Sequence, residues 1–411
     1  MSALAGLRVL DLTRFWAGPA LTEVLADMGA EVIKVEAIQS LDMWRTGGAR
    51  MVLDEQEDVP LYEACSIFNA VNRNKLGITL DLTRPAGQDL FKRLVVHCDV
   101  VAENFTPRVM PKFGLDYAAL SALREDLIMV ALPGFGSTGP WAHFSAFAFP
   151  TEQMSGFPAL TGYAGGRPMC WGNAGADAIA GMVGAFAVLA ALEHRRRTGE
   201  GQFIDVSQAE ALAAFLGQQA IDHSWNGRDW PRRGNRDPHM APHGIFPCRE
   251  PDTWIAIAAQ DDDEWRALAG VLERADLAQE TLAQRQAHED ELEALVSAWT
   301  STQDRFAAME HLQAQGVAAG AVLGGADLLE NPQLTARGYW HWIERRHMGC
   351  FPIHAMWAQF SATPAEIRRP APLLGEHNAE VLGGLLGLDD AELERLAADG
   401  IIGTVPLVAP R

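Results

Sequence analysis

The first third of the chain repeats a strand followed by a turn and, in most cases, a helix. This repetition restricts the fold more than any other feature. Strands are predicted over residues 7–12, 31–36, 77–82, 99–102 and 127–132, and helices over residues 18–28, 85–97 and 116–123. Strands joined through helices pair in parallel, so the expected fold is α/β, with a Rossmann-like sheet in a large domain. The turns after the strands then meet at the carboxyl edge, where open α/β sheets bind ligands.

The turn after the first strand lacks the glycine pattern of dinucleotide-binding folds. It reads Thr13-Arg-Phe-Trp-Ala-Gly-Pro19, with no G-x-G-x-x-G. That pattern provides the tight turn and the close backbone approach that a pyrophosphate needs. Glu36 ends the second strand where a ribose-binding acid could stand, but without the glycines a dinucleotide-dependent oxidoreductase is only weakly indicated.

A long helix of small residues is predicted in the middle of the chain. Residues 178–192 carry no charge, and the polar segment Glu193-His-Arg-Arg-Arg197 follows them. The uncharged run is shorter than the roughly 20 residues that span a bilayer, so it predicts a buried helix and no membrane segment. Gly181 and Gly184 lie at helical spacing, and their bare face can admit another backbone or a flat ligand.

Asp177 stands at the N-terminal end of this helix, and its position allows two interpretations. As an N-cap, its carboxylate would accept backbone N–H bonds. As a nucleophile, it would be held ionised by the helix dipole, and the small residues around it would leave room for an acyl group.

Composition limits the partners. The chain has 411 residues, a net charge of −20 and five cysteines without a C-x-x-C pair. The acidic balance argues against nucleic acid as a partner. The cysteine usage and an N-terminus without a signal-peptide pattern favour the cytoplasm. His239 and His243 are four residues apart, but Pro242 interrupts the helical spacing, so no metal site is expected.

The segment Asn72-Arg-Asn-Lys75 directly precedes a predicted strand. Two cations and two amides at such a position can hold a phosphate, and the alternative is a solvated loop. Glu152 is a single carboxylate among apolar and small neighbours ahead of Asp177. It is either a surface or helix-cap acid, or a carboxylate facing an acyl pocket, where proximity to Asp177 would raise the pKa of one of the two acids.

The domain organisation follows from changes in character along the chain. Residues 1–223 and 334–411 are expected to build the large domain, and residues 224–333 a smaller α/β domain with its linkers. Residues 224–253 resemble a domain crossing, and the segment from about residue 334 is aromatic and irregular.

Several segments in one order resemble the class III CoA-transferase family, the carnitine/bile-acid CoA-transferase superfamily that includes formyl-CoA transferases. The resemblance covers nearly the whole chain. The matching segments are Leu7-Arg-Val-Leu-Asp-Leu-Thr13, Ala17-Gly-Pro19, Gly29-Ala-Glu-Val-Ile-Lys-Val-Glu36, Asn72-Arg-Asn-Lys75, Val101-Ala-Glu-Asn-Phe105, Gly134-Phe-Gly136, Asp177 with Gly181, Ala191-Leu-Glu-His-Arg195, Ala241-Pro-His-Gly244 and Leu374-Gly-Glu-His377.

The resemblance implies a homodimer of two interlocked chains and a CoA-transferase reaction. Asp177 falls on the family's catalytic aspartate. CoA would pass from an acyl-CoA thioester to a carboxylic acid acceptor through an aspartyl-CoA intermediate, with coenzyme A as substrate and no metal. The residues expected near CoA are Arg14, Phe15, Trp16, Ala17, Asn72, Arg73, Lys75, Asn104 and Arg108.

The chain departs from the family at several positions around this site. Trp16 replaces a glutamine, Phe149 replaces an aspartate, Ala37 replaces a basic residue, and Arg108 replaces a glycine. With Trp171, the bulky Trp16 and Phe149 predict a larger or more apolar acyl group.

Two alternatives stay open within the resemblance. α-Methylacyl-CoA racemases of the same superfamily pair a histidine with the aspartate in a His-Asp-x-Asn-Tyr-like segment, but this chain has His143-Phe-Ser-Ala146 there. A non-catalytic CoA-binding protein is the other alternative. Glu152 is predicted as a second catalytic residue, a protonated donor to the acyl oxygen.

Overall fold

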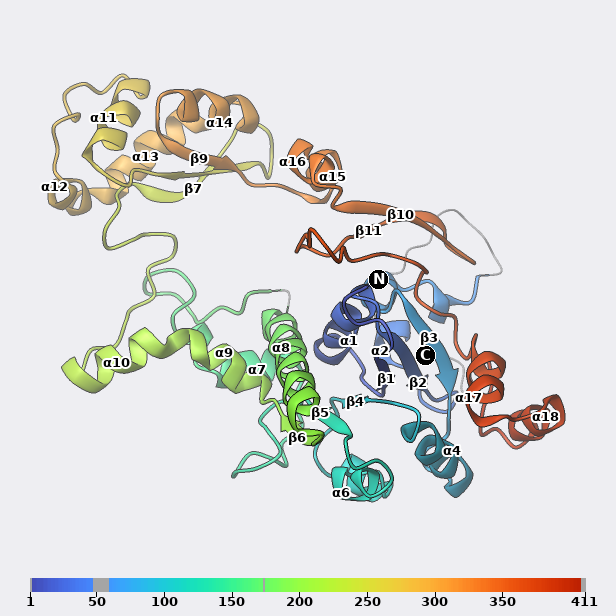
Figure 1. Ribbon diagram of the computed structural model, residues 1–411. Helices are drawn as coiled ribbons and strands as arrows, with labels where there is room; N and C mark the ends of the chain where they lie inside the picture. The colour runs from blue at the N-terminus through green and yellow to red at the C-terminus, as the bar shows by residue number, and fades with distance from the viewer. Residues whose placement is uncertain (1, 47–58, 173, 408–411) are drawn as a thin grey trace. The chain divides into compact units, whose positions relative to one another are not determined.

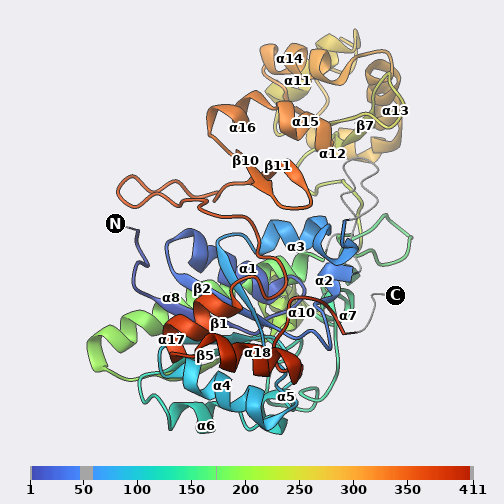
Figure 2. The same ribbon diagram turned by 90° about the vertical axis from the view of Figure 1, so that its right-hand side faces the viewer.

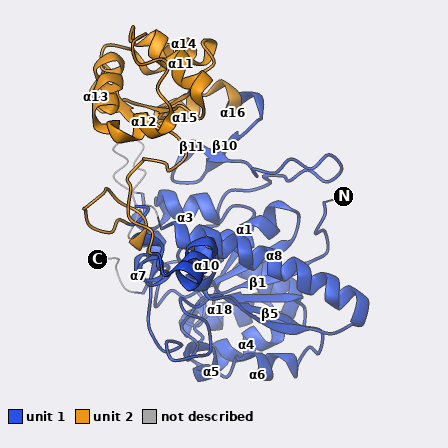
Figure 3. Ribbon diagram, turned by 90° about the vertical axis from the view of Figure 1, so that its left-hand side faces the viewer, with its two compact units in different colours: residues 1–158, 170–228, 335–411 blue, residues 159–169, 229–334 orange. Residues whose placement is uncertain are grey.

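The structure, a computed structural model, describes residues 2–46, 59–172 and 174–407. Asn173 and residues 47–58 lie outside these ranges, and with them the acidic patch that the sequence contains from Asp54 to Asp58. The chain forms two compact units: unit 1 contains residues 1–158, 170–228 and 335–411, and unit 2 contains residues 159–169 and 229–334 (Figure 3). Residues 159–169 belong to unit 2, although we expected them in the large domain from the sequence.

Unit 1 is built on a six-stranded parallel sheet in the order β3-β2-β1-β4-β5-β6 (Figure 1). Its strands are β1 (Arg8–Asp11), β2 (Glu31–Glu36), β3 (Lys75–Thr79), β4 (Val100–Glu103), β5 (Ile128–Ala131) and β6 (Gln202–Asp205). The predicted α/β class and parallel sheet are confirmed. From β1 the chain adds β2 and β3 on one side and then β4, β5 and β6 on the other, so the strand order reverses between β1 and β4. Doubly wound sheets bind ligands at this switch point.

The helices of unit 1 lie between and after these strands along the chain. They are α1 (Ala17–Asp27), α2 (Met43–Thr46), α3 (Ser66–Val71), α4 (Pro85–Val95), α5 (Val109–Lys112), α6 (Tyr117–Ser121), α7 (Ala148–Met154), α8 (Gly175–Thr198), α9 (Gln208–Ala213), α10 (Gly217–Asn226), α17 (Gly384–Leu386) and α18 (Asp390–Ala398).

Both faces of the sheet are buried, as a parallel sheet requires. Val9 points into the core beneath α1 and α8, and its neighbour Leu10 points into the core on the opposite face. This alternation is the two-residue period of a strand. On the Leu10 face, α17 and α18 lie beside α4 (Figure 2), so the C-terminal segment completes a core that starts at the N-terminus.

The glycines of α8 bring it close to α1. A Cβ added at Gly181 would lie 2.7 Å from the carbonyl oxygen of Ala17, and one at Gly184 would lie 2.5 Å from Leu21 Cδ1. The sequence allowed either another backbone or a flat ligand against this bare helix face. The structure places the backbone of α1 there.

Helix α8 is longer than its uncharged run. It spans 24 residues and is the one helix, within the described residues, that is long and apolar enough to cross a membrane by length and composition. The expectation that no segment reaches that length is therefore wrong, because the helix begins at Gly175 and continues to Thr198. In this structure 44% of the most apolar 18-residue stretch of α8 is buried inside the protein. Helix α8 packs on α1 as a core helix does.

The edge strand β3 is covered by the return segment of the chain. The backbone N–H of Gly77 donates to His377 Nδ1 at 3.0 Å, and that of Thr79 donates to Asn378 Oδ1 at 2.8 Å. Unpaired edge groups can pair with a second molecule, so these side chains protect the edge.

Unit 2 contains the antiparallel sheet β7-β8-β9 with helices packed on its apolar face. Its elements are β7 (His243–Pro247), β8 (Trp254–Ala258), β9 (Ala318–Ala321), α11 (Asp262–Val271), α12 (Leu282–Ala287), α13 (Glu289–Thr300), α14 (Arg305–Ala314) and α15 (Gly325–Glu330), and α16 (Pro332–Ala336) lies at the border with unit 1.

Residues 224–253 and the segment after about residue 334 both contain strands, so the prediction of irregular chain after residue 334 is wrong. Residues 224–253, expected to be a domain crossing, include the boundary between the two units after Arg228 and also β7, whose pairing with β8 joins Ile245 to Ala256. The segment after about residue 334 contains the hairpin of β10 (Trp340–Arg345) and β11 (Gly349–His354). Proline and glycine at these positions conceal the strands, because both residues are disfavoured in strand interiors.

Candidate functional site

Three segments of unit 1 meet beyond the carboxyl ends of β1 and β4. The loop after β1 brings Phe15 into edge-to-face contact with Phe147, with ring centroids 5.2 Å apart. Phe147 precedes α7, which carries Glu152. The packing of Gly181 against Ala17 brings the start of α8 to the same loop, so Asp177 stands one helical turn before that contact.

Asp177 is the third residue of α8, and its side chain is buried at 7% exposure. Ala174 occupies the N-cap position in a left-handed conformation, without a capping side chain. The N-cap interpretation of Asp177 is therefore wrong. No described residue donates a hydrogen bond to the Asp177 carboxylate, and the backbone N–H of Asp177 donates to Ala174 O at 3.0 Å.

Burial raises the pKa of the Asp177 carboxyl to about 7. The sequence led us to expect a group held ionised by the helix dipole. Desolvation outweighs that stabilisation because the carboxylate has lost water and has gained no partner among the described residues. A buried carboxyl that titrates near neutrality is a common property of functional sites.

Glu152 lies on α7 and is fully buried. Its Oε1 accepts the backbone N–H of Trp171 at 2.6 Å, and its Oε2 has no partner within the described part of the chain. It is therefore neither a surface acid nor a helix cap. The raised pKa expected for one of the two acids is found at Asp177, and its cause is burial and not proximity to Glu152.

Aromatic side chains predicted to face an acyl group lie on the same segments. Phe149 and Trp171 are about half exposed, and Trp16 precedes α1 and is partly exposed. His143, the position considered for a racemase base, is exposed and makes no contact with Asp177 among the described interactions.

A pocket of about 330 Å³ lies at the carboxyl ends of β1, β2 and β3. Its lining residues include Leu12, Arg14, Glu36, Ala37 and Phe105. This edge is where open α/β sheets bind nucleotides and related ligands.

Two of the predicted CoA residues shape the wall of this pocket. Arg14 N–H donates to Asn104 Oδ1 at 2.8 Å, and Asn104 Nδ2 donates back to Arg14 O at 2.7 Å. The pair fixes the loop after β1 to the loop after β4. Arg108 follows on that second loop and is exposed, and its side chain has no partner among the described residues, whereas Ala17 is buried against α8.

The segment Asn72 to Lys75 does not face this pocket. Lys75 Nζ contacts Asp11 Oδ2 at 3.0 Å and Asn72 Oδ1 at 2.9 Å, and Arg73 pairs with Asp27 at 2.6 Å. The side chains of Asn72, Arg73 and Lys75 are all fully buried. Their charges are matched by carboxylates from β1 and α1, so this geometry argues against direct contact with a phosphate and against the solvated-loop alternative.

The sequence interpretation missed the carboxylates that bind this segment. Asp11, Glu23 and Asp27 are all buried beside Arg73 or Lys75. The available signal was the placement of Glu23 and Asp27 in a helix that is otherwise apolar, since buried acids are nearly always paired.

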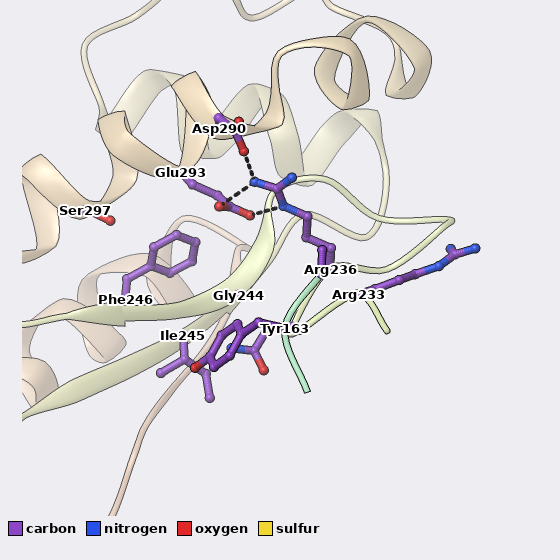
Figure 4. A pocket seen from close by; sticks show the side chains of 12 residues that line it. Tyr163, Arg233, Arg236, Gly244, Ile245, Phe246, Asp290, Glu293 and Ser297 are labelled. Atoms are coloured by element: carbon purple, nitrogen blue, oxygen red, sulfur yellow. Dashed lines mark hydrogen bonds and ion pairs between the residues drawn. The ribbon is translucent and has the colours of Figure 1, made fainter. Parts of the chain in front are cut away.

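A second pocket, of about 400 Å³, lies within unit 2 (Figure 4). Arg236 borders it and is bound by Glu293 at 2.7 Å and by Asp290. Arg233 points away from these acids (Figure 4). The charge of Arg236 is already neutralised, so we do not assign this pocket to an anionic ligand. The described residues contain no group of three or more His, Cys, Asp and Glu placed to hold a metal ion.

The chain belongs to CoA-transferase family III. The family model matches residues 4–378. The doubly wound sheet, the aspartate at the start of α8 and the pocket at the carboxyl edge thus belong to an enzyme of the CoA-transferase class.

Individual relatives are similar over almost their whole length. The succinate–glutarate CoA-transferase of Agrobacterium fabrum is 36% identical over 386 residues, which cover 93% of this chain and 95% of that protein. The succinyl-CoA–D-citramalate CoA-transferase of Chloroflexus aurantiacus is 34% identical, with 97% and 98% covered. The crystal structure of a CAIB/BAIF family protein from Brucella suis is 33% identical, covers 93% of this chain and 99% of its own, and superposes with a TM-score of 0.85.

Proposed function

We propose that this enzyme transfers CoA between carboxylic acids through covalent intermediates on Asp177. The carboxylate attacks the thioester carbonyl of the donor, and CoA leaves as a thiolate, giving a mixed anhydride. The thiolate then attacks the aspartyl carbonyl and releases the donor acid, giving an aspartyl-CoA thioester. The acceptor carboxylate reverses these two steps, which regenerates Asp177 and yields the new acyl-CoA.

The observation that supports this proposal is the buried Asp177 carboxylate, which accepts no hydrogen bond from the described residues. In the reaction above, acids enter and leave as carboxylates and CoA leaves as a thiolate, so no step requires a proton donor or acceptor. A racemase instead needs acid and base groups on the two sides of the substrate. The exposed His143, without contact to Asp177 among the described interactions, offers no such base, and this favours a transferase.

The substrate class can be proposed from two directions. The relatives named above act on succinate, glutarate and citramalate, so a succinyl-CoA donor is proposed. The half-exposed rings of Phe149 and Trp171 favour a larger or more apolar acid as acceptor.

Intact-protein mass spectrometry tests the proposal. The protein is mixed with succinyl-CoA, glutaryl-CoA and an aromatic acyl-CoA in separate reactions. The expected result is a mass increase equal to CoA minus water with at least one donor, located at Asp177 by peptide mapping. Binding of CoA without any adduct for the whole panel would instead indicate a non-catalytic CoA-binding protein.

We propose that the CoA nucleotide occupies the pocket at the carboxyl edge, with the loop from Arg14 to Ala17 along its wall and Arg108 at its mouth. The support is the exposed guanidinium of Arg108, which has no partner within the described part of the chain and lies next to Val109, a residue that lines the pocket.

Replacing Arg108 with alanine is expected to weaken CoA binding about tenfold, because a charge-assisted hydrogen bond contributes about 1.5–3 kcal/mol. Isothermal titration calorimetry with CoA measures the change. Arg93→Ala is the matched control: Arg93 is exposed on α4 and donates to Leu386 O. Equal affinities of the Arg108 variant and the parent would remove Arg108 from the CoA site.

We propose that the molecule is an interlocked homodimer. The support is an exposed apolar stripe on α8, in which Phe186 is 73% exposed and Val183 40%, together with α10, which has no buried residue (Figure 1). An isolated ten-residue helix is marginal in water, so α10 requires a partner surface. Apolar patches of this kind commonly mark interfaces.

The charged variant Phe186→Glu is expected to weaken the dimer strongly, because it places a carboxylate on the apolar stripe. Light scattering after size-exclusion chromatography measures the mass. Parent protein that runs as a folded, active monomer would contradict the dimer.

A location in the cytoplasm stays a prediction, in line with five cysteines that are all free.

A further inference from the structure

Glu152 is an unusual group for a protein core. It is fully buried on α7, and only one of its two oxygens has a partner within the described residues, the backbone N–H of Trp171 at 2.6 Å. A buried carboxylate with an unpartnered oxygen is costly, so its presence requires a reason.

The hydrogen-bond partner of Glu152 lies six residues before Asp177. Two described residues between them have left-handed backbone: Gly172 has φ +80° and Ala174 has φ +52°. A left-handed conformation at alanine is strained and persists only where neighbouring contacts impose it. The Asp177 N–H donates to Ala174 O at 3.0 Å, which ties Asp177 to this strained residue.

Trp171 provides those neighbouring contacts. Its ring lies edge-to-face on Phe157, with centroids 4.6 Å apart. It also lies against the first residue of α8: a Cβ added at Gly175 would be 2.0 Å from Trp171 Cε3. The Trp171 backbone is thus held by Glu152 and its ring by Phe157 and Gly175.

We propose that Glu152 is a positioning residue, which acts on Asp177 through Trp171 and Gly175. It anchors the Trp171 backbone, the Trp171 ring fixes the first residue of α8, and the strained N-cap residue Ala174 then sets the direction of the Asp177 carboxylate. This inference rests on the proposed function, in which Asp177 is the nucleophile. It replaces the expectation that Glu152 donates a proton or hydrogen bond to the substrate.

Two variants of Glu152 test the proposal. Glu152→Ala removes the acceptor of the Trp171 N–H, and Glu152→Gln keeps an acceptor oxygen of the same reach. The rate of single-turnover labelling at Asp177 is expected to fall at least about tenfold in the alanine variant, because a displacement near 1 Å is enough for such a loss. The glutamine variant is expected to stay within about threefold of the parent, with CoA affinity unchanged in both.

Thr151→Val is the matched control. Thr151 is also fully buried on α7, but its hydroxyl donates only to Phe147 O and Ala148 O. A loss of labelling equal to that of Glu152→Ala would indicate general damage to α7 and would overturn the proposal. A pH–rate profile that loses a limb in Glu152→Gln would also overturn it, because a positioning residue leaves that profile unchanged.

Hydrogen exchange of the peptide containing residues 170–177 separates failure of this inference from failure of the proposed function. Faster exchange in Glu152→Ala, restored in Glu152→Gln, supports the anchoring role even if no acyl-CoA labels the parent. Equal exchange in all variants overturns it.

Should Glu152→Ala fail to fold, Gly175→Ala carries the test instead. Its added Cβ meets the Trp171 ring. Labelling is expected to fall at least about tenfold in this variant and to recover in part in Gly175→Ala combined with Trp171→Ala, a non-additive pair. Purely additive losses would overturn the proposal.

Discussion

Replacing Asp177 with asparagine is expected to abolish CoA transfer, with a rate loss of at least about 10⁴-fold, the scale seen when a catalytic nucleophile is removed. Asparagine keeps the size of the side chain but cannot form the anhydride or the CoA thioester. The measurement is transfer of CoA from the donor that labels the parent, together with the intact mass of the variant. Full activity of the variant, or an adduct of unchanged amount, would contradict the role of Asp177.

The same substitution is expected to stabilise the fold at high pH. The pKa of Asp177 is raised from 3.8 to about 7 in the folded protein. As pH rises from about 4 to 7, the unfolded chain loses this proton while the folded chain retains it, so the parent loses stability across that window. Asp177→Asn lacks this penalty and should be more stable at pH 8 by an amount on the order of a few kcal/mol.

The pH dependence of labelling provides a further check on Asp177. The attacking form is the carboxylate, so the rate of adduct formation in the parent should rise with pH and level off above a midpoint of about 7. A midpoint near 4 would show that the carboxyl is better solvated, or better paired, than in this structure.

Replacing Lys75 with alanine is expected to lower the free energy of unfolding by about 3–5 kcal/mol, because it leaves Asp11 buried without its principal cation. Lys75 also binds Thr22 Oγ1 at 2.8 Å and Asn72 Oδ1 at 2.9 Å, so several polar groups lose a partner at once. The midpoint of urea unfolding measures the effect.

A matched control for this prediction is Lys112→Ala, which removes an exposed lysine of α5 and should change stability by less than about 0.5 kcal/mol. If Lys75→Ala unfolds at the same urea concentration as the parent but binds CoA more weakly, the original phosphate-binding interpretation of Lys75 is restored.

Local pattern was sufficient to predict the large sheet. Strands such as β2 are short apolar runs bounded by helix signals, and Glu31–Glu36 has the bounds expected from the sequence. The hairpin of β10 and β11 was missed because Gly349 and Pro352 lie within β11 and both residue types are disfavoured in strands, which suggests irregular chain.

The site was predictable only where the decisive contacts are local or follow from the family. The sequence indicated Asp177 but not the burial of Lys75, because the carboxylate that binds it comes from Asp11, 64 residues away. Likewise, Glu152 was singled out by its apolar neighbours, whereas its bond to the Trp171 backbone depends on how α7 packs, which no spacing rule encodes.

The protection of β3 by His377 and Asn378 has a consequence for synthesis of the protein. The strand is made almost 300 residues before its cover, since 299 positions separate Thr79 from Asn378. During translation unit 2 is completed first, while the edge of β3 stays open. The core of unit 1 can be completed only after residues 335–411 have been synthesised. Contacts between residues so far apart in the sequence slow folding. The ribosome-bound chain thus carries an open strand edge, a target for chaperones or for a second nascent copy.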